Sequence, residues 1–366
     1  MPQARTPQHY TLVDGLRAVA ALAVVLYHYM HFAMIGTDHD RYVEYLTFQP
    51  FRSGLALFYD HGHYAVQLFW LISGFVFAAV YFERDTTTRG FAANRFARLY
   101  PLHLLTLLIV AALQAAAVTR LGHTLLYDNF DWQHFALQLI FASDWVEGQG
   151  HSFNGPIWSV SIEVVVYALF WILRRPLDKA GPVGLLGVIG LCLLASALGA
   201  VTRIPVCAFY FFSGVALLRL HKWLAWKWRL PVVTGLGALG AIGLAQDNAM
   251  LREVVGLTGL FAAMLLALAS LESRTGAALR RASAWLGDCT YGIYLWHVPL
   301  QLALMLALLP QFNPAVVASK TWFLPLWLGT VIAAARLSFV WIERPAREAL
   351  RRLGKPRRKG QAAWAG

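Results

Sequence analysis

Apolar stretches close to twenty residues long recur along the whole chain and are separated by short polar loops. Each stretch is long enough to cross about 30 Å of hydrocarbon as an α-helix. The pattern predicts an all-α polytopic membrane protein with about ten transmembrane helices. These helices are expected at approximately 11–34, 62–82, 99–118, 156–174, 183–202, 204–220, 230–246, 254–271, 289–309 and 322–342.

The composition supports a membrane protein. Hydrophobic residues make up 58% of the 366 positions and charged residues 14%, whereas a soluble domain carries roughly 25% charge. A soluble helical bundle would need polar helix faces, and these segments lack them. Cys192, Cys207 and Cys289 are scattered without metal-binding or redox spacing, so we interpret them as structural thiols.

The distribution of basic residues predicts the orientation in the membrane. The formal net charge is +12, and Lys and Arg gather in short loops between the apolar stretches. This arrangement is typical of cytosolic loops and does not require a nucleic-acid partner. Segment 134–145 is too short to span. If it re-enters and returns within an outward excursion at 120–155, the basic loops all face the cytosol, namely 83–98, 174–182, 219–229 and 274–281.

The sequence predicts a single membrane domain. No internal repeat, heptad run or low-complexity block is visible, so we divide the chain into a membrane domain at 1–346 and a basic cytosolic tail at 347–366. Asp14 and Arg17 interrupt the first apolar stretch, and no small-residue cleavage site follows it. We therefore expect a retained first helix rather than a signal peptide, with both termini in the cytosol.

Ionisable residues inside the predicted helices are the candidates for chemistry, because a charged group in a bilayer is costly. In the first helix, Arg17 and His28 are eleven residues apart. That spacing places them on one helix face, separated by about 16 Å along the axis. The alternative is an arginine at the membrane interface and a histidine that is hydrogen-bonded within the bundle.

Two other helices contribute a carboxylate and an imidazole. Glu163 lies about 10 Å below the outer end of the fourth helix, in the same half of the bilayer as His28. A carboxylate at that depth can orient an imidazole that takes a proton from a hydroxyl. The alternative for Glu163 is a bond to a neighbouring helix. His297 lies in the ninth helix among aromatic residues, where a histidine is more often structural than catalytic.

Three further residues are candidates for ligand binding. The pair Ser73–Gly74 indicates close helix packing, or an opening for a narrow ligand, and Ser73 has no base beside it in the sequence. Arg95 and Arg98 stand beside a predicted cytosolic helix start, which suits phosphate binding. The positive-inside rule explains the same two arginines equally well.

Over about residues 10–346 the chain resembles the acyltransferase-3 family of integral membrane O-acyltransferases. Each matching piece is short, but six of them occur in the family's order. Ala18 and Asn94 depart from the pattern, at positions where a glycine and a basic residue are common. The matching pieces are Asp14–Gly15–Leu16–Arg17 followed by His28, Phe69–Phe75 around Ser73–Gly74, Arg95-x-x-Arg98-Leu99-x-Pro101, Trp158–Ser159-x-Ser161-x-Glu163, Tyr291-Gly-Ile-Tyr294-Leu-Trp-His297, and Trp341-x-Glu343-x-Pro345.

The resemblance implies an enzyme that moves an acyl group, with acetyl expected, from cytosolic acyl-CoA to a hydroxyl of an exported or lipid-linked carbohydrate. It implies that His28 is the catalytic histidine and that Arg17 is its partner along a polar channel. Arg95 and Arg98 would serve the acyl-CoA, which is a co-substrate. Because the thioester is already activated, we expect no metal and no permanently bound cofactor.

The expected mechanism uses His28 as general base, with Glu163 or His297 fixing its tautomer. Ser73 is expected beside the donor. A transient acyl-histidine is the less favoured variant.

A transporter is the competing prediction, in which buried His, Glu and Arg line a substrate or proton pathway. Many transporters have repeated halves, and no repeat is visible in this sequence, so the motifs favour an enzyme. The expected partners are acyl-CoA, a carbohydrate or lipid-linked glycan acceptor and the lipid bilayer, with no nucleic acid. The expected location is the bacterial inner membrane.

Overall fold

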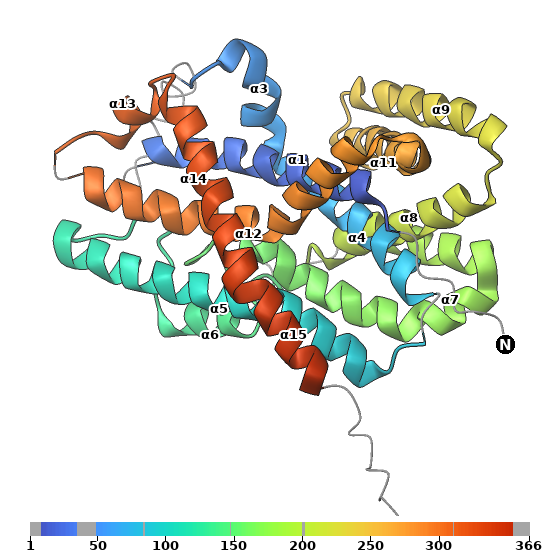
Figure 1. Ribbon diagram of the computed structural model, residues 1–366, viewed down its shortest axis with the longest axis horizontal. Helices are drawn as coiled ribbons and strands as arrows, with labels where there is room; N and C mark the ends of the chain where they lie inside the picture. Colours follow the sequence, from blue (N-terminus) through green and yellow to red (C-terminus); the bar gives the residue numbers. More distant parts are fainter. Residues whose placement is uncertain are drawn as a thin grey trace, which may run out of the picture.

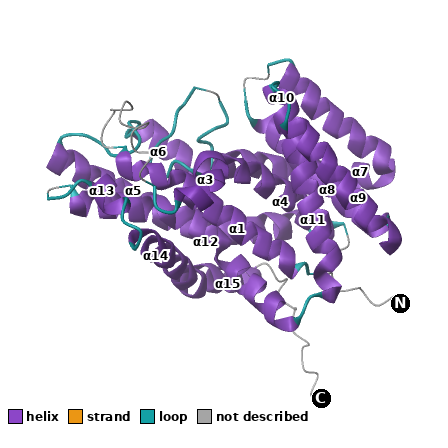
Figure 2. Cartoon of the chain, turned by 90° about the horizontal axis from the view of Figure 1, so that it is seen from above, coloured by secondary structure: helices purple, strands orange, loops and turns teal. Residues whose placement is uncertain are grey.

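The computed structural model describes residues 9–34, 49–82, 85–146, 148–199, 202–309 and 311–353. Regular structure in these ranges is helical (Figures 1 and 2), apart from one isolated bridge between Asn129 and Ser152. The first half contains α1 (Thr11–Tyr27), η1 (His28–Ala33), α3 (Arg52–His61), η3 (Gly62–Tyr64), α4 (Ala65–Tyr81), α5 (Thr88–Leu121), α6 (Trp132–Leu139) and α7 (Ile157–Ala197). The second half contains α8 (Ile204–Trp223), α9 (Trp226–Leu244), α10 (Ala249–Leu251), η4 (Arg252–Leu257), α11 (Thr258–Leu271), η5 (Glu272–Arg274), α12 (Ala277–Leu308), α13 (Pro314–Ala318), α14 (Phe323–Ser338), η6 (Phe339–Glu343) and α15 (Arg344–Leu353).

The predicted all-α polytopic fold is confirmed. Among the described residues, eight helical segments are long and apolar enough to cross a membrane. The expected fourth and fifth spans form one element, α7, in which Gly181 has non-helical dihedrals of φ 62° and ψ −148°. The expected seventh span is α9, which is helical over 19 residues but is not among the eight, because Lys227 and Arg229 lower its mean hydropathy.

Two predictions concern a short central segment and the C-terminal tail. Helix α6 has eight residues, so segment 134–145 does not cross as a helix, and its re-entry into a bilayer stays a prediction. The predicted basic tail begins inside α15, and its residues 354–366 lie outside the described ranges.

Close backbone contacts fix how the central helices pack. Helix α1 packs along α12, α4 packs along α8, and α12 also contacts α14. A Cβ added to Gly74 would lie 1.7 Å from the Phe211 carbonyl oxygen, and one added to Gly214 would lie 1.9 Å from the Leu71 oxygen. Small residues allow such approach between membrane helices. The packing role predicted for Gly74 is therefore confirmed, and it holds Ser73 against the bundle interior.

Candidate active site

A basic cavity of about 370 Å³ lies between the start of α1, the C-terminal half of α4, the first turns of α5 and α15. Four arginines line it, namely Arg17, Arg95, Arg98 and Arg347. Among the described lining residues, Asp14 is the one acidic side chain, and its Oδ1 lies 3.9 Å from Arg17 Nη1. The cavity is therefore suited to a ligand with several negative charges.

The two arginines that the sequence singled out, Arg95 and Arg98, both face this cavity. The Arg95 guanidinium lies over the rings of Phe77 and Tyr81, with its Cζ 4.8 Å and 5.7 Å from their centroids. Neither arginine forms an ion pair with a carboxylate in the described part of the chain. Arg347 was missed by the sequence analysis, although it follows the Trp341-x-Glu343-x-Pro345 motif by two residues.

A narrower cavity of about 60 Å³ continues from the basic cavity into the bundle. The two cavities share the lining residues Arg17, Ser73, Arg98 and Tyr167. The narrow cavity reaches Tyr294 of α12, whose hydroxyl lies 2.7 Å from Ser159 Oγ. A continuous path therefore leads from the arginines to the middle of α12.

Glu163 lines the narrow cavity and does not contact His28, so the expected Glu163–His28 pair is wrong. Ser73, Tyr167 and Arg17 line this cavity together with the buried Glu163 side chain, whose Oε1 has no hydrogen-bond partner among the described residues. The two residues were expected at a similar depth. Glu163 instead lies beside Arg17, which precedes His28 on α1 by eleven residues or about 16 Å, so the carboxylate stands well below the end of α1.

His28 stands where α1 ends and the 3-10 helix η1 begins. Its Nδ1 lies 2.9 Å from the carbonyl oxygen of Val24, one turn earlier. A carbonyl can only accept, so Nδ1 carries the proton in this contact and Nε2 keeps a lone pair. The tautomer is therefore set by a backbone oxygen, and not by Glu163 or His297 as expected.

His297 stacks on His28, with ring centroids 5.0 Å apart and an interplanar angle of 29°. It is fully buried, and its two ring nitrogens make no hydrogen bond of standard geometry, although the carbonyls of Ile293 and Tyr294 lie near the ring. The Tyr294 ring lies 6.1 Å from it. His297 thus lies between the Tyr294 ring, at the end of the narrow cavity, and the His28 ring, and neither histidine lines that cavity.

Two residues that the sequence analysis missed complete the surroundings of His28. His31 lies with its ring 4.8 Å from the His28 ring, and its Nδ1 is 3.2 Å from Gln301 Oε1. The Gln301 amide donates to the His28 carbonyl oxygen over 2.8 Å. Gln301 follows His297 by four residues, so both lie on one face of α12. That spacing was the available signal in the sequence.

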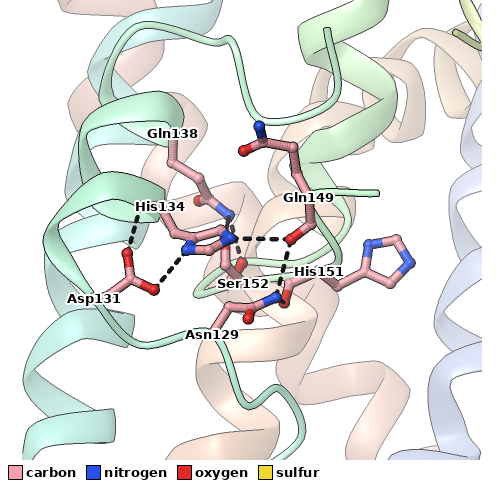
Figure 3. Close-up of polar contacts among 7 residues, drawn as sticks. All are labelled: Asn129, Asp131, His134, Gln138, Gln149, His151 and Ser152. Carbon is pink, nitrogen blue, oxygen red and sulfur yellow. Dashed lines mark hydrogen bonds and ion pairs between the residues drawn. The ribbon is translucent and has the colours of Figure 1, made fainter. Parts of the chain in front are cut away.

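A polar network fastens the loop between α6 and α7 (Figure 3). His134 bridges the loop, with Nδ1 2.6 Å from Asp131 Oδ2 and Nε2 2.9 Å from the Gln149 carbonyl oxygen. Asn129 donates to the carbonyl oxygens of Gln149 and His151, each over 3.1 Å. The His151 ring projects away from this network, and it acts electrostatically on His28. The network therefore holds a further imidazole near the end of α1.

These features define the class of protein as a multi-pass membrane protein with a basic cavity, a narrow cavity that continues from it to Tyr294, and a stacked pair formed by the buried His297 and the half-buried His28. The chain belongs to the family of the acyltransferase domain, which matches residues 10–342. It is therefore an enzyme that transfers acyl groups, and the resemblance inferred from the six motifs is confirmed.

Three relatives are similar to parts of the chain. The exopolysaccharide production protein ExoZ of Rhizobium meliloti (strain 1021) is 28% identical over 320 residues, which is 81% of this chain and 92% of that protein. The acyltransferase MdmB of Streptomyces mycarofaciens is 31% identical over 169 residues, 46% of this chain and 40% of that protein. Protein 2 in the picA locus of Rhizobium radiobacter is 38% identical over 110 residues, 29% of this chain and 46% of that protein. The match thus spans less than half of the last two relatives. No solved structure matches the chain.

Proposed function

We propose that the enzyme moves an acyl group, with acetyl expected, from cytosolic acyl-CoA to a hydroxyl of an exported or lipid-linked carbohydrate at the bacterial inner membrane. The observation that carries the proposal is the pair of continuous cavities that lead from the four arginines to Tyr294, whose ring lies 6.1 Å from His297, the residue that stacks on His28. The name of ExoZ, which matches along most of its length, supports a carbohydrate acceptor.

The donor is assigned to the basic cavity. The phosphates of acyl-CoA meet the guanidinium groups of Arg95, Arg98 and Arg347, which offer fixed pairs of N–H donors. The pantetheine arm then points along Arg17 and Ser73 toward α12. The narrow cavity, at about 60 Å³, is smaller than the volume of this arm. The side chains that line the narrow cavity must therefore move when the donor binds.

The chemical step is assigned to His28. Nε2 accepts the proton of the acceptor hydroxyl while the hydroxyl oxygen attacks the thioester carbonyl carbon. The carbon–sulfur bond breaks, the new ester forms, and the imidazolium returns its proton to the coenzyme thiolate. Val24 and Gln301 position His28 through its Nδ1 and its backbone carbonyl. Glu163 positions Arg17 and Ser73 in the donor path.

The test is a reconstituted assay. The purified protein in liposomes receives acetyl-CoA labelled in the acetyl group, together with a glycan and glycolipid extract of bacterial envelopes. Release of the coenzyme thiol should accompany an equal amount of label in an alkali-labile carbohydrate ester. Flux of solute across the liposomes without any ester would contradict the proposal and favour the transporter.

A further inference from the structure

A second hollow, of about 650 Å³, lies between α1, α3, α4 and α11. On α1 it is lined by Leu16, Val19 and Ala20, on the face beside the one that carries Arg17. On α11 it is lined by Leu260 and Met264. Its volume falls in the range of about 300–1,000 Å³ that ligand pockets occupy. We call it the apolar groove.

One end of the apolar groove is polar. His61, Tyr64, Arg252 and Glu253 line it there, and neither Arg252 nor Glu253 forms an ion pair within the described ranges. Arg252 precedes Met264 by twelve residues, which corresponds to roughly 18 Å along a helix axis. The groove therefore combines a long apolar part with a head region that offers hydrogen-bond donors and acceptors.

The backbone at the polar end is built unusually. Arg252 and Glu253 open the π-helix η4 (Arg252–Leu257), a wide turn that is rare and is found frequently at functional sites. Helix α9 presses against this turn, because a Cβ on Gly243 would lie 2.4 Å from the Gly256 nitrogen. The two polar side chains are thus held at the groove by a rigid contact between backbones.

The polar end leads to His28 through a series of rings. The ring of His61 lies 6.1 Å from that of Tyr64 and 6.5 Å from that of His63. The His63 ring lies 4.9 Å from Tyr27, and the Tyr27 ring lies 5.2 Å from His28. The rings of His61, His63 and Tyr27 therefore separate a polar head group at the end of the groove from His28, the proposed general base.

We propose that the apolar groove binds the hydrocarbon chain of the acceptor, a carbohydrate carried on a long-chain lipid through an anionic linkage. This inference rests on the proposed function and selects the lipid-linked acceptor from its two alternatives. A water-soluble sugar has no use for an apolar groove of this length. The guanidinium of Arg252 suits the linkage, and the mixed donors and acceptors of the head region suit sugar hydroxyls.

The head region is what selects this lipid over bulk phospholipid. Bilayer chains are as apolar as the groove, so burying a chain there brings no hydrophobic gain. Binding energy must come from shape and from the contacts of the head group. Once the chain is seated, the sugar is restricted to a short arc above Tyr27 and His28, which raises the effective concentration of one hydroxyl at Nε2.

Photo-crosslinking in bacterial membranes tests the groove without knowledge of the acceptor. A benzophenone side chain replaces Met264, which is 37% exposed in the groove, or Leu186 of α7, which is 64% exposed and lines none of the cavities described above. Position 264 should capture a glycolipid, identified by its mass, and position 186 only phospholipid. The same phospholipids at both positions, or a peptide of this chain at position 264, would overturn the proposal.

A kinetic arm separates this inference from the proposed function. Val19→Trp fills the groove, and Leu186→Trp is the matched control. The extracted glycolipid and the glycan released from it serve as acceptors. Val19→Trp should raise KM for the glycolipid about tenfold, equivalent to about 1.4 kcal/mol, without changing KM for the released glycan or for acetyl-CoA. Equal wild-type activity on both acceptors would refute the lipid site. Capture of glycolipid by a protein that transfers nothing would instead reject the proposed function and keep the site.

Discussion

The donor assignment predicts that replacing both Arg95 and Arg98 with Gln weakens acyl-CoA binding and leaves the chemical step intact. Both guanidinium groups line the basic cavity, and neither is held by a carboxylate among the described residues. Glutamine keeps a hydrogen-bonding side chain but removes the charge. The change should therefore raise KM for the donor more than it lowers kcat, the signature of lost uniform binding.

The magnitude follows from the kind of contact that is lost. A hydrogen bond to a charged group contributes about 1.5–3 kcal/mol, and the lower value applies here because the cavity is open to water and salt. At 1.4 kcal/mol per tenfold, each arginine accounts for about tenfold in Kd and the pair for about a hundredfold. Arg17 and Arg347 remain, so the loss should not exceed this.

The matched control is Arg89→Gln. Arg89 lies on the same helix, α5, and is exposed, but it lines neither the basic nor the narrow cavity. Binding of acetyl-CoA to purified protein is measured by calorimetry at low and high salt, and the difference between wild type and double variant should shrink as salt rises. Unchanged binding by the double variant, or an equal loss in Arg89→Gln, would mean that these arginines only set topology.

Three further predictions test packing, orientation and the outer loop. Gly74→Ala should lower the free energy of unfolding by about 1–3 kcal/mol, because the added Cβ meets the backbone of α8. Gly235→Ala, which has open space around it, should leave this free energy unchanged, and thermal unfolding in detergent compares the two variants. A lone cysteine at Lys179 should react with a membrane-impermeant maleimide only after permeabilisation, and labelling of intact cells would overturn the cytosolic assignment. The backbone N–H of His134 holds the pKa of Asp131 below its usual value of about 3.9. The contribution of Asp131 to the stability of the loop is therefore fully present above a pH of about 3.9 and is lost only as the pH falls through the lowered pKa. Hydrogen exchange at 129–152 should therefore stay slow from pH 7 to about 4 in the wild type and be fast at pH 7 in Asp131→Ala; release of the wild-type loop near pH 6 would contradict this.

The helices were predictable because each follows from local hydropathy and length, which the bilayer thickness constrains. The axial separation of Arg17 and His28 was predictable for the same reason, since helical rise is fixed, whereas Glu163 lies beside Arg17 and not at the depth expected for His28. Which helices lie side by side could not be predicted. The contacts between helices depend on which glycines allow two backbones to come close, as Gly74 does at α8, and on how each helix is rotated about its axis.

The candidate site contains both contacts that could be predicted from the sequence and contacts that could not. Glu163 was expected beside His28 and instead lies in the narrow cavity near Arg17. The Val24 oxygen that fixes the His28 tautomer is one turn away and could have been found from i,i−4 spacing. Arg347 and the apolar groove depend on contacts between helices far apart in sequence, which no local pattern indicates.

The most direct test of the proposed mechanism is acyl transfer by His28→Ala, compared with His123→Ala at an exposed histidine that lines none of the cavities described above. The assay follows consumption of acetyl-CoA and formation of the carbohydrate ester together in liposomes. The account predicts that His28→Ala folds, inserts and binds acetyl-CoA like the wild type, while transfer falls by at least the roughly 10²–10⁴-fold that a positioned base supplies. His123→Ala should keep most of its activity. Turnover by His28→Ala at the wild-type rate would contradict the proposed mechanism.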